Sequence, residues 1–139
     1  MEKKPTITIQ STVNASVEKA WKTYNTPTDI MQWNNASDDW HTPKAENDLR
    51  AGGSFSYTMA AKDGSFSFDF AGIYDDIKKN ELVAYTIADG RKVTTTFEPI
   101  GNATKVTTTF EAENQNSIEL QRTGWQAILD NFKKYTENN

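Results

Sequence analysis

The sequence contains no cysteine, which excludes a disulfide framework, a thiol nucleophile and a metal site with cysteine ligands. It has a single histidine, His41, and one histidine without cysteine cannot build a usual zinc site. No window approaches the roughly 18 consecutive apolar residues of a membrane span. The charged first residues have no apolar run behind them, so we expect no signal peptide and a cytoplasmic location.

Basic stretches are also lacking. The net charge is −4 and the few lysines and arginines are scattered, so the electrostatic footprint of a nucleic-acid binder is missing. Aromatic residues, in contrast, make up 12% of the 139 residues, which is too much for a disordered chain and suits a core or a pocket built from large rings. The length is that of one ordinary domain, and we expect residues 1–139 to form it.

In the N-terminal part of the sequence, the spacing of apolar residues changes from that of a strand to that of a helix. Apolar and hydroxylic residues alternate over 6–13, which predicts a first strand. Apolar residues then follow at helical spacing from Val17 to Tyr24, which predicts a short helix capped by Asn14 or Ser16.

A second short helix is expected directly after the first. Thr26 is placed to cap it, with Pro27 at its first position and Ile30 and Trp33 along its length. The stretch 34–43 is polar and predicts a loop.

The rest of the sequence predicts a meander and one long helix. Turn signals separate segments of strand character at 44–49, 54–59, 66–77, 82–87, 92–98 and 104–111. Short turns imply antiparallel neighbours. Apolar residues from Ile118 to Tyr135 recur with a period near 3.6, which predicts a helix from about Ser117 to about Thr136 that covers the apolar face of the sheet. The predicted class is therefore α+β.

Four local patterns carry a family resemblance. Residues 17–21 match a helix pattern, and residues 48–55 match D-x-R-x-G-G-x-[FW]. Residues 70–74 match F-x-G-x-[VY], and residues 124–132 match G-W-x-x-x-L-x-x-[LF]. With the order of elements, these stretches resemble the START-like or SRPBCC superfamily, and within it the AHSA1-like family, named after the activator of Hsp90 ATPase.

The resemblance implies a helix-grip fold of the START/Bet v 1-like kind. In that fold a curved antiparallel sheet of about six or seven strands surrounds a long C-terminal helix, and two short helices follow the first strand. It also implies an elongated, partly apolar cavity, which superfamily members use for lipids, sterols, polyketides, hormones or flavonoid-like molecules. It implies no shared reaction and no cofactor.

The leading hypothesis is a small-molecule binding protein that holds a lipid-like, polyketide or flavonoid-like ligand between the sheet and the C-terminal helix. Such sites are mostly apolar with a few polar anchors. Arg122, one turn from the apolar stripe, is a candidate anchor for a carboxylate or hydroxyl, and the alternative is that Gln121 and Arg122 form a solvated flank of the helix. The alternative for the aromatic set is an ordinary packed core. The candidate ligand contacts are Trp33, Trp40, Phe55, Tyr57, Met59, Phe68, Phe70, Tyr85, Phe97, Arg122, Trp125 and Leu129.

Two other hypotheses use the same sequence. An enzyme of the cyclase, hydratase or hydrolase type would need a polar residue in the cavity, with His41, Tyr57 or Asp69 as candidates. A protein-interaction module, such as an Hsp90-type chaperone cofactor, predicts a filled core and an exposed apolar patch. A weak homodimer is a further possible partnership.

Two smaller features have structural readings. Asp48 and Arg50 are two residues apart, which favours an ion pair. Gly124 lies inside the predicted helix at a cost of about 1 kcal/mol relative to alanine. It therefore indicates either close approach to a strand or room for a ligand.

Overall fold

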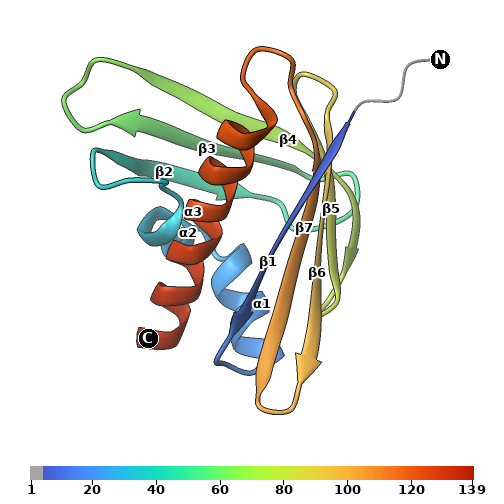
Figure 1. The fold of residues 1–139 in the computed structure, drawn as a ribbon. Helices are drawn as coiled ribbons and strands as arrows, with labels where there is room; N and C mark the ends of the chain where they lie inside the picture. The colour runs from blue at the N-terminus through green and yellow to red at the C-terminus, as the bar shows by residue number, and fades with distance from the viewer. Residues whose placement is uncertain (1–4) are drawn as a thin grey trace.

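In the computed structural model, which describes residues 5–139, seven strands form one antiparallel sheet that curls around a long C-terminal helix (Figure 1). The elements in chain order are β1 (Thr6–Val13), α1 (Val17–Asn25), α2 (Pro27–Trp33), β2 (Trp40–Asn47), β3 (Ser54–Ala61), β4 (Ser67–Lys78), β5 (Leu82–Ile87), β6 (Lys92–Ile100), β7 (Ala103–Glu111) and α3 (Ile118–Asn138). This confirms the predicted α+β class and the helix-grip arrangement.

The strand order is β1-β7-β6-β5-β4-β3-β2, so consecutive strands are neighbours except where β1 joins β7. That pair aligns Thr6 with Glu111 and Val13 with Thr104, which places the first strand beside the last one. The helices α1 and α2 lie between β1 and β2 in the chain, and α3 crosses the concave face of the sheet (Figure 1).

The helix ends follow local chemistry. The Ser16 hydroxyl accepts a hydrogen bond from the Lys19 N–H and caps α1, while the Ser117 hydroxyl accepts one from the Leu120 N–H and caps α3. Pro27 occupies the first turn of α2 as predicted. Thr26 lies at the cap position of α2, but its hydroxyl donates backwards to the Lys22 carbonyl instead of capping.

The prediction of a loop over 34–43 was wrong at its end, because β2 begins at Trp40. Trp40 and His41 pair with Ala61 and Ala60 of β3, and the register shifts between His41 and Lys44. Pro43 lies at that shift, where it has no N–H to give to the ladder. A proline is tolerated there because β2 is an edge strand.

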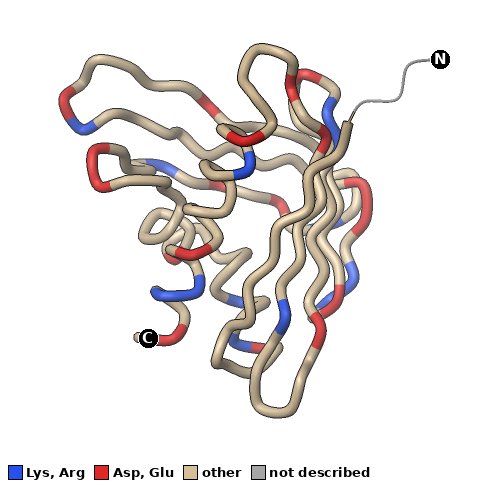
Figure 2. Tube along the Cα trace, in the orientation of Figure 1, with Lys and Arg blue, Asp and Glu red and all other residues tan. Residues whose placement is uncertain are grey.

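The core lies between the concave face of the sheet and the helices. On β7 every second residue from Thr104 to Phe110 is buried, and on α3 Leu129 and Phe132 are buried against that face. Full burial of a large apolar side chain contributes roughly 1.5–3 kcal/mol. Basic and acidic side chains are interspersed over the outer strands and turns (Figure 2). Within residues 5–139, no helix is long and apolar enough to cross a membrane.

Candidate ligand-binding cavity

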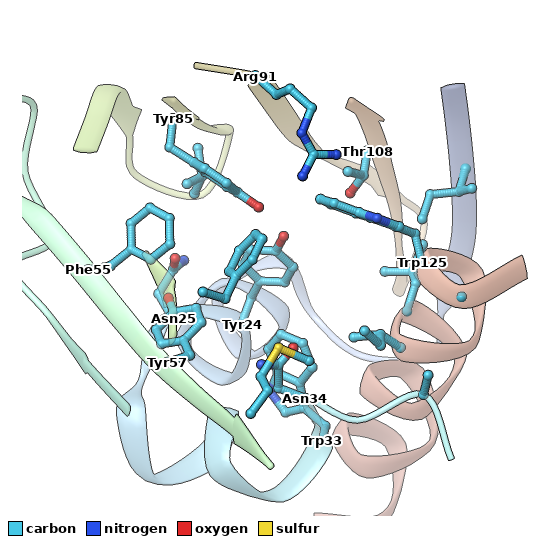
Figure 3. A pocket seen from close by; sticks show the side chains of 18 of the residues that line it. Tyr24, Asn25, Trp33, Asn34, Phe55, Tyr57, Tyr85, Arg91, Thr108 and Trp125 are labelled. Carbon is cyan, nitrogen blue, oxygen red and sulfur yellow. The ribbon is translucent and has the colours of Figure 1, made fainter. Parts of the chain in front are cut away.

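A cavity of about 340 Å³ lies between α3 and the curled sheet (Figure 3). This volume is within the range of small-molecule sites. The lining residues are mainly aromatic, with a few polar groups: Ile9, Tyr24, Asn25, Trp33, Asn34, Ala36, Phe55, Tyr57, Met59, Phe68, Phe70, Tyr74, Val83, Tyr85, Arg91, Thr108, Gly124, Trp125, Ile128 and Leu129.

Phe55 organises the wall that the sheet contributes. Its ring centroid lies 5.2 Å from that of Tyr57, 5.2 Å from that of Tyr74 and 4.9 Å from that of Tyr85. The ring also covers Gly72, where an added Cβ would lie 2.9 Å from two Phe55 ring carbons and 2.4 Å from the Thr86 carbonyl oxygen. Glycine at this position therefore lets Phe55 lie flat against β4.

Trp125 forms the opposite wall, on α3. Its indole stacks on Phe110 with centroids 4.0 Å apart and planes 10° apart, and its edge meets Phe70 at 6.1 Å. The preceding residue, Gly124, also lines the cavity, and a Cβ built on it would meet nothing within 4 Å. Of the two sequence-based readings of Gly124, the structure supports room beside the helix.

Tyrosine hydroxyls supply polarity inside the aromatic walls. Tyr24 shares a hydrogen bond of 3.1 Å with the Thr95 hydroxyl, which in turn shares one of 2.8 Å with Thr108. The Tyr74 hydroxyl accepts from the Asn47 Nδ2 at 3.2 Å, and Tyr57 lies on the neighbouring strand β3. Burial raises the pKa of Tyr24 and raises that of Tyr57 well above its ordinary value. Both hydroxyls are therefore protonated at neutral pH.

Tyr85 and Arg91 both line the cavity toward one end. Figure 3 shows the Tyr85 hydroxyl directed toward the middle of the cavity and the Arg91 guanidinium beside it, near Trp125. Burial raises the pKa of Tyr85 well above 10.0, and the positive charge of Arg91 opposes that shift. The Arg91 Nε donates to the Asp89 carboxylate at 2.8 Å, which fixes the guanidinium in place.

Asn34 lies toward the other end, where α2 stops. Its N–H donates to the Ile30 carbonyl at 3.0 Å, and its own carbonyl accepts from the Thr42 hydroxyl at 2.6 Å. The residue is only 9% exposed, and its side-chain Nδ2 is buried with no hydrogen-bond partner among the described residues. A buried amide without a partner is rare in native proteins and calls for an explanation.

Nine of the twelve residues proposed from the sequence line this cavity: Trp33, Phe55, Tyr57, Met59, Phe68, Phe70, Tyr85, Trp125 and Leu129. Trp33 also fixes α2 to the core, since its Nε1 donates to the Thr23 carbonyl and its ring lies 5.1 Å from that of Phe132. Ligand contact by these nine residues stays a prediction.

The other three proposed residues lie elsewhere. Trp40 packs at 6.1 Å from both Phe66 and Phe68 on the outer end of the sheet. Phe97 packs under α1, 5.3 Å from Trp21. Arg122 is on the exposed first turns of α3 and pairs with Glu119 at 2.9 Å.

The enzyme candidates are separated by the fold. His41 is exposed on the edge strand β2, and Asp69 is exposed on β4 with its carboxylate accepting from the Thr58 hydroxyl, so Tyr57 alone of the three lines the cavity. Within residues 5–139, no three His, Asp or Glu side chains are grouped to hold a metal ion. Asp48 and Arg50 form the expected ion pair, with 2.7 Å between the Arg50 Nε and the Asp48 Oδ2.

Sequence reasoning missed several polar residues of the cavity. Asn34 stood in a stretch read as a loop, Arg91 followed a turn signal, and Tyr24 belonged to a helical stripe read as core. No spacing pointed to them, because the cavity brings together residues from eight separate elements and two connecting segments.

A curled sheet closed around a C-terminal helix, with an aromatic cavity between them, defines a START-like protein of the helix-grip class. The family profile of the Activator of Hsp90 ATPase homolog 1-like proteins matches residues 14–137. The chain therefore belongs to that family, as the resemblance predicted.

Two solved structures are similar in sequence and in fold. The AHSA1-like protein from Aeromonas hydrophila is 40% identical with a TM-score of 0.91, over 96% of this chain and 93% of that chain. Chr148 from Cytophaga hutchinsonii is 56% identical with a TM-score of 0.83, over 96% and 92%. Protein CV1439 from Chromobacterium violaceum shares the fold at 20% identity, with a TM-score of 0.87 over 97% and 99%. No curated protein matches the chain.

Proposed function

We propose that this protein binds a small, largely aromatic or lipid-like molecule in the cavity between α3 and the sheet. The observation that carries the proposal is the open space beside Gly124, in a cavity walled by Trp125 and by the rings around Phe55. Glycine weakens a helix interior by about 1 kcal/mol relative to alanine. A residue that costs stability and leaves a cavity open is expected where a ligand has to fit.

The chemistry of the walls supports binding through hydrogen-bond donors. Tyr57 and Tyr85 stay protonated at neutral pH, because burial raises the pKa of both hydroxyls well above 10.0. A protonated hydroxyl donates to a ligand oxygen but does not act as a base. Binding and orientation therefore fit these groups better than a general-base step does.

The test is a thermal-shift screen against flavonoids, fatty acids, sterols and aromatic acids, with tryptophan fluorescence followed in parallel. Ligand at 100 times its dissociation constant stabilises the folded state by about 2.7 kcal/mol. For a domain of this size that raises the melting temperature by several degrees. A compound that raises the melting temperature and also quenches tryptophan fluorescence supports the proposal. The absence of any thermal shift across all four classes contradicts it.

Gly124→Leu separates this cavity from any other site. The added side chain has open space to occupy, so we expect a folded variant that no longer responds to the hit. Thr123→Leu adds the same side chain on the exposed side of α3 and serves as the matched control. If Gly124→Leu bound the hit as well as the control did, the ligand would have to lie elsewhere.

A second candidate is a protein contact, for which the family name suggests an Hsp90-type chaperone. The specific observation is a cluster of exposed rings, with Phe66 58% and Phe68 40% exposed and both 6.1 Å from Trp40. Phe66→Ser should abolish capture of the purified chaperone while leaving ligand response intact. Equal capture by wild type and variant, or none by either, would remove this candidate.

A further inference from the structure

Two polar groups lie at separate ends of the cavity, and both are hydrogen-bond donors. Figure 3 shows Arg91 at the upper end, beside Tyr85 and Trp125, and Asn34 near the lower end, beside Trp33. Aromatic side chains fill the walls between them. We infer that the ligand is an aromatic molecule with oxygen at both ends, an ionised acid group against Arg91 and Tyr85 and a neutral acceptor oxygen against Asn34. This inference rests on the proposed function and narrows its ligand class.

The Asn34 end calls for an acceptor oxygen. Hydrogen bonds to Ile30 and Thr42 hold the backbone of Asn34 on both sides, while its side chain remains free to rotate about χ1 and χ2. Its Nδ2 has no accessible surface and no partner among the described residues, on a residue that lines the cavity, so a rotation of the side chain would be needed to bring it to a ligand oxygen. Leaving a buried donor unpaired costs free energy, which a ligand carbonyl or hydroxyl oxygen would recover.

The Arg91 end calls for an anion. Arg91 lines both the cavity and an adjoining surface groove, which also includes Gly124 and Trp125, so its guanidinium stands at the mouth between them. Its side chain is only 17% exposed. A guanidinium suits a carboxylate or phenolate because its donors form a planar fork. The Tyr85 hydroxyl, directed into the cavity beside it, adds a donor for the same group (Figure 3).

Two carboxylates lie in the same region as Arg91 and reduce the expected preference for an anionic ligand group. Asp89 accepts from the Nε and from the backbone N–H of Arg91. Glu113 lines the outer groove, where its carboxylate accepts from the backbone N–H of Asn116 at 2.6 Å and from its Nδ2 at 3.2 Å. Asp89 orients the guanidinium but also offsets part of its charge. We therefore expect a moderate preference for an anion at the mouth, where water also reaches the acid group.

Three probes on one biphenyl scaffold separate the two ends: 4′-acetylbiphenyl-4-carboxylate, biphenyl-4-carboxylate and 4-acetylbiphenyl. Their dissociation constants are measured by calorimetry and tryptophan quenching on the whole protein. Wild type should bind the probe that carries both the carboxylate and the acetyl group about tenfold more tightly than either probe that carries one of them. A tenfold difference in the dissociation constant corresponds to one moderate polar contact. This comparison needs no variant.

Two variants assign the ends. Arg91→Gln should weaken both carboxylate probes about tenfold and leave the neutral ketone within about twofold. Asn34→Leu keeps the branched shape of the side chain at a somewhat larger volume and should weaken both ketone probes about three- to tenfold, leaving biphenyl-4-carboxylate within about twofold. Asn34→Ala replaces Asn34→Leu if the larger side chain prevents folding, which circular dichroism reports.

The outcomes separate the inference from the function on which it rests. If all three probes bound wild type equally well, or if each variant weakened all three alike, the two-ended ligand would be wrong while the cavity remained the binding site. If none of the probes bound wild type and the broader screen were also silent, the inference and the proposed function would both fail. The crossed pattern, with each variant affecting its own pair of probes, is the result that supports the inference.

Discussion

The indole of Trp125 lies flat on the ring of Phe110, with 4.0 Å between centroids and 10° between planes. Phe110 is fully buried on β7, whereas Trp125 is partly buried on α3 and presents its remaining surface to the cavity. One ring pair thus joins the helix to the sheet and forms a wall of the candidate site. Changes at Trp125 should affect stability and binding together.

Trp125→Ala should lower the free energy of unfolding by about 2–3 kcal/mol, below the value for a fully buried tryptophan. It should also weaken ligand binding about tenfold or more, because large aromatic anchors dominate binding energy. Trp125→Phe keeps a ring against Phe110 and should recover most of the stability. It should also reduce the quenching by ligand, and the quenching that remains should come from Trp33, the other tryptophan that lines the cavity. A bound ligand whose affinity survived Trp125→Ala would show that this residue is not a contact.

Two glycines should respond to alanine in opposite directions. At Gly124 the new Cβ meets nothing within 4 Å, so Gly124→Ala should stabilise the protein by about 0.5–1 kcal/mol through helix propensity. At Gly72 it would lie 2.4 Å from the Thr86 carbonyl oxygen, so Gly72→Ala should destabilise by about 3 kcal/mol. Urea denaturation measures both. Equal destabilisation by the two changes would contradict the open space beside Gly124.

The buried tyrosines predict loss of stability in alkali. Burial raises the folded-state pKa of Tyr57 and Tyr85 well above 10.0, the value expected in the unfolded chain. Their contribution is therefore fully present below pH 10 and is lost as pH rises from there toward the folded-state pKa. In that window the ionisation of each tyrosine lowers the free energy of unfolding by up to about 1.4 kcal/mol per pH unit. Tyr85→Phe should make the free energy of unfolding, measured by urea denaturation, fall less steeply between about pH 9 and pH 11. An unchanged slope would contradict the assignment.

Glu137 predicts a smaller effect in acid. Its carboxylate pairs with Lys133 and accepts from the backbone N–H of Asn14 at 2.7 Å, and these contacts lower its pKa below 4.5. The stabilisation is present above pH 4.5 and is lost as pH falls through the lower folded-state value. Glu137→Gln should reduce stability at pH 7 and make the acid dependence shallower. Parallel pH curves for variant and wild type would contradict this.

The sequence predicted the fold well because its periodicities are local. Alternation over 104–110 and the stripe that includes Leu129 and Phe132 fix which faces are buried, and the turn signals fix the order of the strands. The edge strand β2 was the exception, since Pro43 and polar residues hide a strand whose ladder is interrupted by a bulge. Such a strand has little alternation to detect.

The site was less predictable because it depends on where elements end. Arg122 is one turn before Trp125, but its side chain is exposed and pairs with Glu119, whereas the neighbouring Gln121 is buried. Phe97 faces the concave side but lies under α1, against Trp21. Arg91, and not Arg122, is the cationic residue that lines the cavity, because the turn between β5 and β6 places it at the cavity mouth. The spacing of residues in the sequence does not show where a helix or a turn lies relative to the cavity.

The most direct measurement is a set of intermolecular NOEs from a bound aromatic probe in isotope-filtered NMR. The cavity account predicts contacts from probe protons to the Trp125 indole, the Gly124 Hα and the Leu129 methyls, and their disappearance in Gly124→Leu. Contacts confined to the exposed rings of Phe66 and Trp40, or contacts that persist in Gly124→Leu, would contradict it.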